Sequence, residues 1–226
     1  MGACGRTEVA PLLRKVEVSK ARCKFETVKA PTWQQLTARN TAATDLDLSG
    51  SLHVVGDTDT CFVDDHFEFR YGQGDRWWVE RNGEVVYASL SLTDTVPVAR
   101  IDGQMVHQRT TSLIRLGALF TPRDLLGPRS LLTRRGPAQH VTKGPTAIDH
   151  AGRPAWSIEL ASSTGLTTTM VIDDGTGLIA SLSSRDHGKS LSLDNLTEHA
   201  ELPDDRFVWD GDTIESNDLR TFRLSW

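Results

Sequence analysis

The chain has 226 residues, of which 38% are hydrophobic and 24% charged, with 30 acidic against 25 basic side chains. This balance is typical of an ordinary globular protein and excludes the disordered, collagen-like and disulfide-framework classes. No uncharged apolar stretch reaches the roughly 18 residues of a membrane span, and residues 1–30 lack the apolar run of a signal peptide. We therefore expect a cytoplasmic protein if Met1 is the true start, or an exported or lipid-anchored one if a leader has been removed.

The cysteines indicate a reducing compartment. Cys4, Cys23 and Cys61 are odd in number and form no CxxC pair. Disulfide frameworks and zinc sites both need cysteines in pairs at characteristic spacings. We expect three free thiols.

The N-terminal part of the chain is predicted to be helical over about residues 9–44. Its first segment, residues 9–28, carries an apolar stripe that begins after Pro11. A second helix is expected to start at Thr32, whose hydroxyl can cap the backbone amides while Gln35 reaches back in a capping box. This helix should end before Asp45.

From residue 46 onward apolar and polar residues alternate, which indicates strands with one buried face. Phe67, Phe69 and Tyr71 follow this period on one strand. Asn82-Gly83 is the dipeptide best suited to a type I′ turn and predicts a tight hairpin, and Asp102-Gly103 predicts a second one.

Two further turn signals extend the predicted sheet toward the C-terminus. Residues 152–154 (Gly-Arg-Pro) predict a turn that leads into another strand. Residues 167–172 and 178–183 flank a longer turn with two glycines, which can take left-handed conformations. The predicted sheet therefore spans residues 46–110 and 140–210.

A leucine-rich helical insertion interrupts the strands at about residues 111–132. Pro122, Gly127 and Pro128 prevent one continuous helix, so two or three short helices are expected. The open face of a curved antiparallel sheet is the natural partner for their apolar faces. The prediction is a single α+β, mainly β domain over residues 1–226, in which one curved antiparallel sheet forms an incomplete β-barrel and short helices plug its concave face.

The seven histidines do not predict a metal site. None of them forms an HxH or HxxxH pair, and the strongest local cluster is Asp64-Asp65-His66. Alternation places Asp64 and His66 on one side of a strand, but two ligands on one side do not make a site. We therefore expect no metal and read these histidines as exposed residues at hairpin ends.

Catalytic and cofactor signatures are missing from the sequence. No GxSxG motif and no cysteine nucleophile pattern occurs, so catalytic residues stay unknown. Residues 72–74 (Gly-Gln-Gly) precede a strand rather than a helix and do not predict a nucleotide site. No cofactor is expected.

Charged residues are unevenly distributed along the chain. Residues 109–143 are basic, with Asp124 as their single acid, whereas residues 194–226 are rich in acids. Such blocks either form complementary faces, within the fold or between the subunits of a homodimer, or are solvated surface. The basic block has few aromatic residues for base stacking, so no nucleic-acid partner is expected.

Large apolar side chains are frequent on the predicted strands and in the insertion. On a curved sheet they would line the concave side, where most would simply be core. A sheet that curves without closing also leaves a cleft that can bind an apolar ligand. The candidate residues are Phe67, Phe69, Tyr71, Trp77, Trp78, Met105, Phe120, Trp156 and Met170.

Four segments of the sequence resemble actinobacterial members of the LolA/RseB-like lipoprotein-carrier superfamily. They are residues 67–87, 152–160, 170–179 and 203–210, within a resemblance that spans about residues 46–210. The resemblance implies an incomplete antiparallel β-barrel around short helices, whose cavity holds lipid acyl chains or senses mislocalised lipoproteins. Carriers of that group are exported, whereas no export signal is visible here.

A second, weaker resemblance is to the VioE-like enzymes of violacein biosynthesis, which are cytosolic and share this fold. Residues 119–126 and 203–207 carry it. It implies a cofactor-free enzyme of secondary metabolism, in which Arg123 and Arg109 would hold an acidic substrate because guanidinium groups match carboxylates. The leading hypothesis is non-catalytic binding of a hydrophobic or lipid-like molecule by residues that include Arg123. The alternatives are this enzyme and a protein-interaction domain with an acidic C-terminus.

Overall fold

The computed structural model describes residues 29–58, 61–90, 98–101, 103–107, 120–135, 139–184 and 188–215. Its helices are α1 (Trp33–Ala42) and α2 (Leu131–Arg135), with the 3-10 helices η1 (Ala43–Asp45), η2 (Pro122–Asp124) and η3 (Asp204–Phe207). Its strands are β1 (Asp47–Asp57), β2 (Phe62–Gly72), β3 (Arg76–Arg81), β4 (Glu84–Ser89), β5 (Val98–Ile101), β6 (Gln104–His107), β7 (Gln139–His150), β8 (Arg153–Ser162), β9 (Thr167–Asp173), β10 (Ile179–Ser184), β11 (Lys189–His199) and β12 (Ile214–Glu215).

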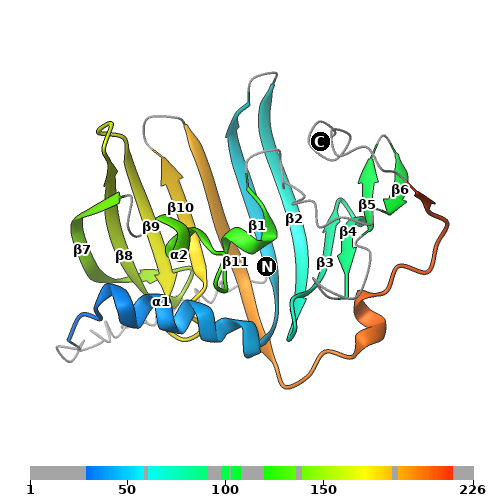
Figure 1. The fold of residues 1–226 in the computed structure, drawn as a ribbon, viewed down its shortest axis with the longest axis horizontal. Helices are drawn as coiled ribbons and strands as arrows, with labels where there is room; N and C mark the ends of the chain where they lie inside the picture. The colour runs from blue at the N-terminus through cyan, green and yellow to red at the C-terminus, as the bar shows by residue number, and fades with distance from the viewer. Residues whose placement is uncertain are drawn as a thin grey trace, which may run out of the picture.

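The strands form one twelve-stranded sheet in the order β12-β6-β5-β4-β3-β2-β1-β11-β10-β9-β8-β7 (Figure 1). All neighbours are antiparallel except β12 and β6, which pair in parallel. The sheet is curved and not closed, with β7 and β12 as its edges. The predicted mainly β fold with a single open sheet is confirmed.

Helix α1 begins as the sequence predicts. The Thr32 hydroxyl accepts a hydrogen bond from the Gln35 amide at 3.2 Å, and the Gln35 side chain accepts one from the Thr32 amide at 2.8 Å. This capping box satisfies two amides that have no partner within the helix. Figure 1 shows α1 crossing the ends of β8 to β11, where it buries Leu36 and Asn40.

The predicted hairpins are present. Asn82 (φ 53°) and Gly83 (φ 77°) join β3 to β4 with the two positive φ angles of a type I′ turn. Gly103 lies in the turn between β5 and β6, and Gly177 in the turn between β9 and β10. The turn before β8 is centred on Ala151-Gly152, one residue earlier than predicted, because Arg153 already pairs with His150.

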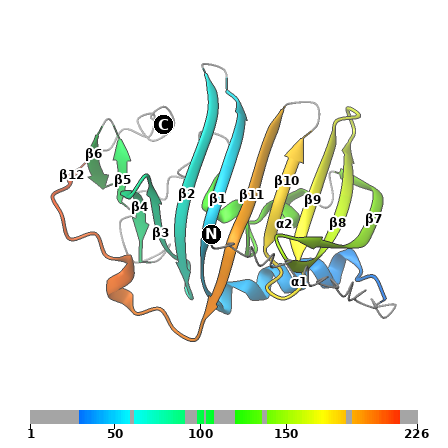
Figure 2. The same cartoon turned by 180° about the vertical axis from the view of Figure 1, so that it is seen from behind.

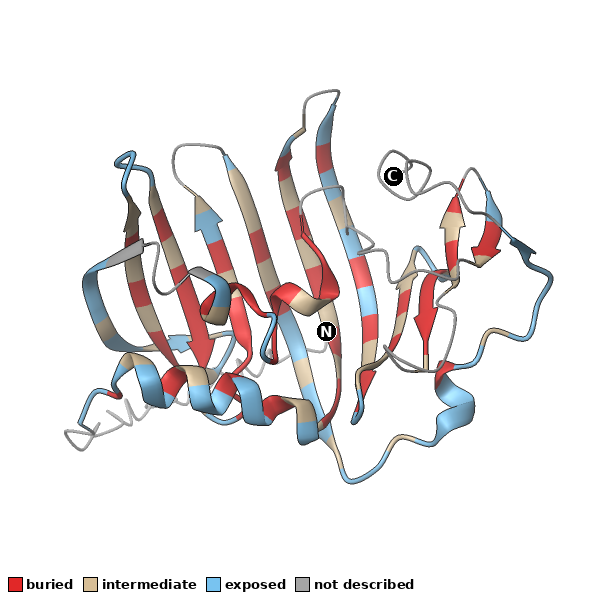
Figure 3. Cartoon of the chain, viewed as in Figure 1, coloured by how far each residue is buried: buried red, intermediate tan, exposed pale blue. Residues whose placement is uncertain are grey.

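Helices cover one face of the sheet, which we call the covered face. The opposite face, seen in Figure 2, is called the open face. Side chains alternate between them along each strand, so buried and less buried residues alternate in Figure 3. The core on the covered face joins α1, the insertion and both halves of the sheet. It includes Leu36, Leu52, Phe67, Phe69, Trp77, Phe120, Leu125, Leu132, Trp156, Met170 and Leu193.

The insertion contains two short helices among its described residues, η2 and α2. This confirms the prediction that its prolines and glycines break a continuous helix. Residues 111–119 of the predicted insertion, residues 9–28 of the predicted N-terminal helix and Asp102 lie outside the described residues. None of the helices that the structure describes is long and apolar enough to cross a bilayer.

The C-terminal segment differs from the prediction that strands continue to residue 210. Strand β11 ends at His199, and the chain turns away into η3, which starts after Pro203. Proline has no amide proton for a strand ladder, and Asp47 on β1 instead accepts the Leu202 amide at 2.8 Å. The segment then returns as β12 at the far edge of the sheet.

Candidate functional site

Six of the predicted ligand-binding residues come together on the covered face. Each is at most 7% exposed and belongs to the same core cluster, from three strands and the start of the insertion. The rings of Tyr71 and Trp77 lie 4.7 Å apart, and those of Phe69 and Trp77 6.1 Å apart. The six residues are Phe67, Phe69, Tyr71, Phe120, Trp156 and Met170, and the candidate Trp77 on β3 joins them as a seventh.

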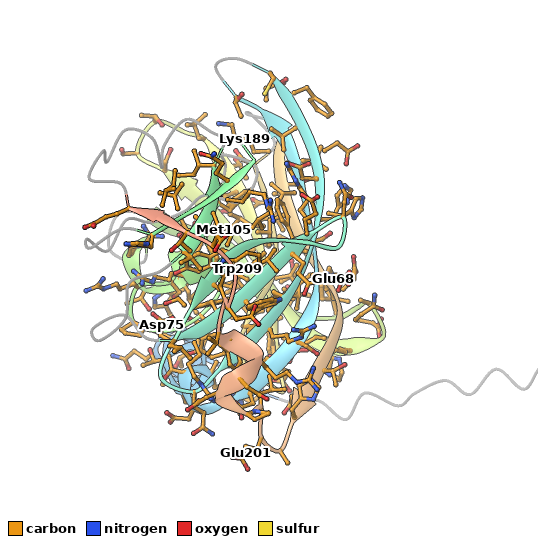
Figure 4. All side chains as sticks on the ribbon, turned by 90° about the vertical axis from the view of Figure 1, so that its right-hand side faces the viewer. Glu68, Asp75, Met105, Lys189, Glu201 and Trp209 are labelled. Atoms are coloured by element: carbon orange, nitrogen blue, oxygen red, sulfur yellow. The ribbon has the colours of Figure 1, made fainter. Side chains whose placement is uncertain are left out.

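Trp78 and Met105 do not join this group. Trp78 follows the inward-facing Trp77 and therefore points to the open face, where its indole N–H donates to Glu80 at 2.6 Å. Met105 lies opposite Arg100 and lines a cavity of about 410 Å³ with Trp209 from the C-terminal segment (Figure 4). The prediction that both line the concave side is wrong, because neighbouring residues of one strand point to opposite faces.

The turn between β2 and β3 places a carboxylate at one end of the covered face. Asp75 has a positive φ of 68°, a conformation that costs energy for residues other than glycine. Its carboxylate is turned back toward β3 and accepts a hydrogen bond from the Trp77 indole at 2.7 Å. Figure 4 shows Asp75 on the side of the sheet opposite to Glu68, which belongs to the open face.

Helix η2 brings Arg123 to this carboxylate. Asp124 accepts the Thr121 amide at 2.7 Å and forms an ion pair with Arg134, and Pro122 fixes the first residue of the turn. This arrangement holds Arg123 Nε 3.3 Å from Asp75 Oδ2, with the two side chains 12% and 20% exposed. Arg109, the other predicted clamp, lies outside the described part of the chain.

The electrostatics of this cluster are those of a poorly solvated site. Burial raises the pKa of Asp75 above its usual value, although the Trp77 hydrogen bond and the charges of Arg123 and Arg129 act in the opposite direction. Burial also raises the pKa of Tyr71, and the nearby Asp75 charge adds to this shift. The pKa of Tyr87 is raised by burial as well, against the effect of Arg123. Both tyrosines are therefore neutral hydroxyl groups at physiological pH.

Two polar atoms in the cluster are buried and make no hydrogen bond to any described residue. They are Nη1 of Arg123 and Oδ2 of Asp75. The two side chains are joined by the ion pair through Nε of Arg123, and the Arg123 guanidinium also lies next to the Tyr87 hydroxyl. Buried polar atoms in folded proteins are nearly always satisfied, so an unsatisfied N–H of a guanidinium is an available donor. Arg123 can therefore bind an anionic or carbonyl oxygen at the edge of the aromatic core. We call Asp75, Trp77, Tyr87 and Arg123 the Arg123 cluster.

The open face carries a second hollow, of about 530 Å³, in which Arg153 and Asp173 already bind each other. Arg153 donates to Asp173 at 2.7 and 3.2 Å and to Glu198 at 3.1 Å. Although burial alone would raise it, the hydrogen bonds from Arg153 and Thr176 hold the pKa of Asp173 below its usual value. The Arg153 guanidinium is therefore already bound by two carboxylates.

Of the Arg123 cluster, the sequence predicted Arg123 and Trp77 as candidates but not Asp75 or Tyr87. Asp75 lies in the turn between β2 and β3, and no sequence pattern links it to residue 123. Its one available signal was an acid between a glycine and two tryptophans, at a turn position where the carboxylate can reach back to an indole.

No family model and no curated protein matches the chain. Among solved structures it is similar to MucB, with a TM-score of 0.47 and 15% identity over 78% of this chain; the chain spans only 62% of the MucB chain. MucB has also been solved in complex with MucA of Pseudomonas aeruginosa. A LolA superfamily protein from Nitrosomonas europaea is similar over 80% of this chain and 99% of its own, with a TM-score of 0.39 and 9% identity.

Proposed function

We propose that this protein binds a hydrophobic, lipid-like molecule with an acidic group, without catalysis, at the covered face of its sheet. The apolar part of the ligand would lie against the aromatic core, and its acidic group would bind the free N–H of Arg123. The observation that carries the proposal is the buried Nη1 of Arg123, which makes no hydrogen bond to a described residue, on a side chain next to Asp75 and Tyr87. Guanidinium groups bind carboxylate and phosphate oxygens more strongly when water is excluded.

The insertion is the element that would make room for the ligand. Helix η2 has three residues and α2 five, so neither is stable on its own and both depend on packing against the sheet. Their apolar side chains, such as Phe120, Leu125 and Leu132, occupy the covered face as an acyl chain would. An incoming chain can therefore replace one set of apolar contacts with an equivalent one.

A fluorescence titration tests this proposal. Purified full-length protein is titrated with 11-(dansylamino)undecanoic acid, which has an apolar chain and a carboxylate, and with the uncharged probe N-phenyl-1-naphthylamine. We expect saturable micromolar binding of both. Arg123→Gln should weaken binding of the acidic probe by about tenfold or more, because hydrogen bonds to charged groups contribute ~1.5–3 kcal/mol. The same substitution should leave the affinity for the neutral probe unchanged.

Two further variants keep the test decisive. Arg123→Lys retains the charge opposite Asp75 but not the planar fork, so it should fold and still bind the acidic probe more weakly. Arg70→Gln removes an arginine of the open face that lies 3.6 Å from Glu80, and it should bind like the wild type. Absence of saturable binding of either probe to the wild type, at concentrations where its far-UV circular dichroism is native, would contradict the proposal.

A further inference from the structure

Two histidines and an aspartate meet on the open face, at the free end of the β1–β2 hairpin. His53 on β1 lies directly opposite His66 on β2, and Asp64 is two residues before His66 on the same face. The two imidazole rings are stacked, with centroids 4.0 Å apart and an interplanar angle of 8°. His53 Nε2 lies 2.7 Å from Asp64 Oδ1.

These side chains offer three ligand atoms within reach of one ion. One nitrogen from each imidazole and one carboxylate oxygen all lie within 4.8 Å of one another. Ligands bound to zinc at about 2.0–2.1 Å in a tetrahedron are about 3.3 Å apart. The most distant pair of these atoms therefore needs to approach by at most about 1.5 Å, whereas His53 Nε2 and Asp64 Oδ1, now 2.7 Å apart, need to separate slightly. The two stacked rings must also turn out of their parallel arrangement, so that a nitrogen lone pair of each points to the ion. The solvent exposure of the side chains leaves room for this rotation, since His53 is 34% and Asp64 58% exposed.

The backbone that carries the three residues is well fixed. Strand β1 is paired on both sides, with β2 and with β11, and the β1–β2 ladder places His53 directly opposite His66. Ligands on paired strands are held more accurately than ligands on loops. Two imidazoles and one carboxylate, with solvent access for a water molecule as a further ligand, form a donor set that suits zinc and similar borderline divalent ions.

We propose that His53, Asp64 and His66 form a binding site for a divalent transition-metal ion of the zinc type. The ion takes the place of the proton between His53 and Asp64 and joins β1 to β2 on the open face. This site lies on the face opposite to the Arg123 cluster and is independent of the ligand proposed there. Because the ion binds only the folded hairpin, it also raises the stability of the protein.

Isothermal titration with ZnCl₂ tests the site in a background in which Cys4, Cys23 and Cys61 are replaced by serine, so that thiols do not bind the metal. We expect one equivalent of Zn²⁺ to bind with micromolar affinity and EDTA to reverse it. Removing a residue that only hydrogen-bonds to a metal ligand lowers the affinity for the metal by about 10- to 100-fold. Removing a ligand itself, by His66→Gln or Asp64→Asn, should therefore lower the Zn²⁺ affinity at least tenfold. His107→Gln, a histidine on β6 that contacts Thr213, is the matched control and should not change it.

Cobalt gives an independent readout. Co²⁺ bound by the three side chains should produce visible absorption bands that His66→Gln abolishes and His107→Gln retains. Circular dichroism in EDTA shows whether each variant is folded, and both single substitutions at exposed positions should be. The proposal is overturned if the folded wild-type background binds no Zn²⁺ at micromolar concentration, or if His66→Gln and Asp64→Asn bind it as tightly as the control.

Discussion

The buried carboxylate of Asp173 and the half-buried carboxylate of Asp75 have opposite environments. Asp173 accepts hydrogen bonds from Arg153 at 2.7 Å and from the amide and hydroxyl of Thr176 at 2.7 and 2.8 Å. These bonds outweigh burial and keep its pKa low, so the charged form stabilises the fold. At Asp75 burial outweighs the partners and the pKa is raised, so its charge costs stability. Ionisable side chains whose charged form is disfavoured by burial are typical of binding sites.

Asp173→Asn should therefore destabilise the protein at neutral pH. We expect a loss of about 2 to 3 kcal/mol in the free energy of unfolding, the usual contribution of hydrogen bonds to a charged group. Because the folded-state pKa of Asp173 lies below the ordinary value of 3.8, its contribution is complete above that value and is lost as the pH falls below it, through the folded-state pKa. Urea unfolding at a series of pH values measures this.

The exposed Asp194 is the control for that experiment. Asp194→Asn should change neither the stability at pH 7 nor its pH dependence by more than a few tenths of a kcal/mol. If the wild type and Asp173→Asn lose stability in parallel as the pH falls below 3.8, the assigned role of Asp173 is wrong.

At the scale of elements, local sequence signals predicted the helix start, the hairpins and the broken insertion. Each of these depends on residues a few positions apart, such as Thr32 with Gln35 or Asn82 with Gly83. The attachment of α1 depends on a residue that no local signal identifies. Asn40 is fully buried, and its amide donates to the carbonyls of Leu125 at 2.9 Å and Gly177 at 2.8 Å. It joins the helix to the insertion and to the β9–β10 turn.

Asn40→Ala should loosen this attachment. It leaves the Gly177 carbonyl without its donor and the Leu125 carbonyl with the Ile179 amide at 3.0 Å as its remaining donor. An unsatisfied buried carbonyl costs about 1–3 kcal/mol, so we expect about 1 to 3 kcal/mol less stability. Chemical denaturation followed by circular dichroism measures the change. Gln34→Ala, at an exposed position of the same helix, should be nearly neutral. Equal stabilities of the two variants would contradict the role given to Asn40.

At the scale of the whole molecule, one core connects the two halves of the sheet. Trp77 on β3 and Trp156 on β8 belong to the same cluster, together with side chains of α1 and the insertion. The sequence predicted a single domain because no linker or repeat divides it. A shared core of this kind is what makes the parts of a small protein unfold together.

We therefore expect one cooperative unfolding transition. In urea, the circular dichroism signal and the tryptophan emission should change with the same midpoint. Hydrogen exchange followed by mass spectrometry should give peptides from β3 and from β9 the same opening free energy. Two separate midpoints, or early exchange of one half of the sheet, would show that the halves are separate folding units.

What the sequence determined by itself is local: the alternation that makes strands, the turns that join them and the breaks in the insertion. These follow from backbone preferences and side-chain period over a few residues. Only the tertiary structure decided which residues meet. Asp75 reaches Arg123, and His53 meets His66, because strand register and the packing of the insertion bring distant parts of the chain together. Strand register likewise decided the face of the sheet to which Trp78 and Met105 point, since a shift of one residue moves every side chain of a strand to the opposite face.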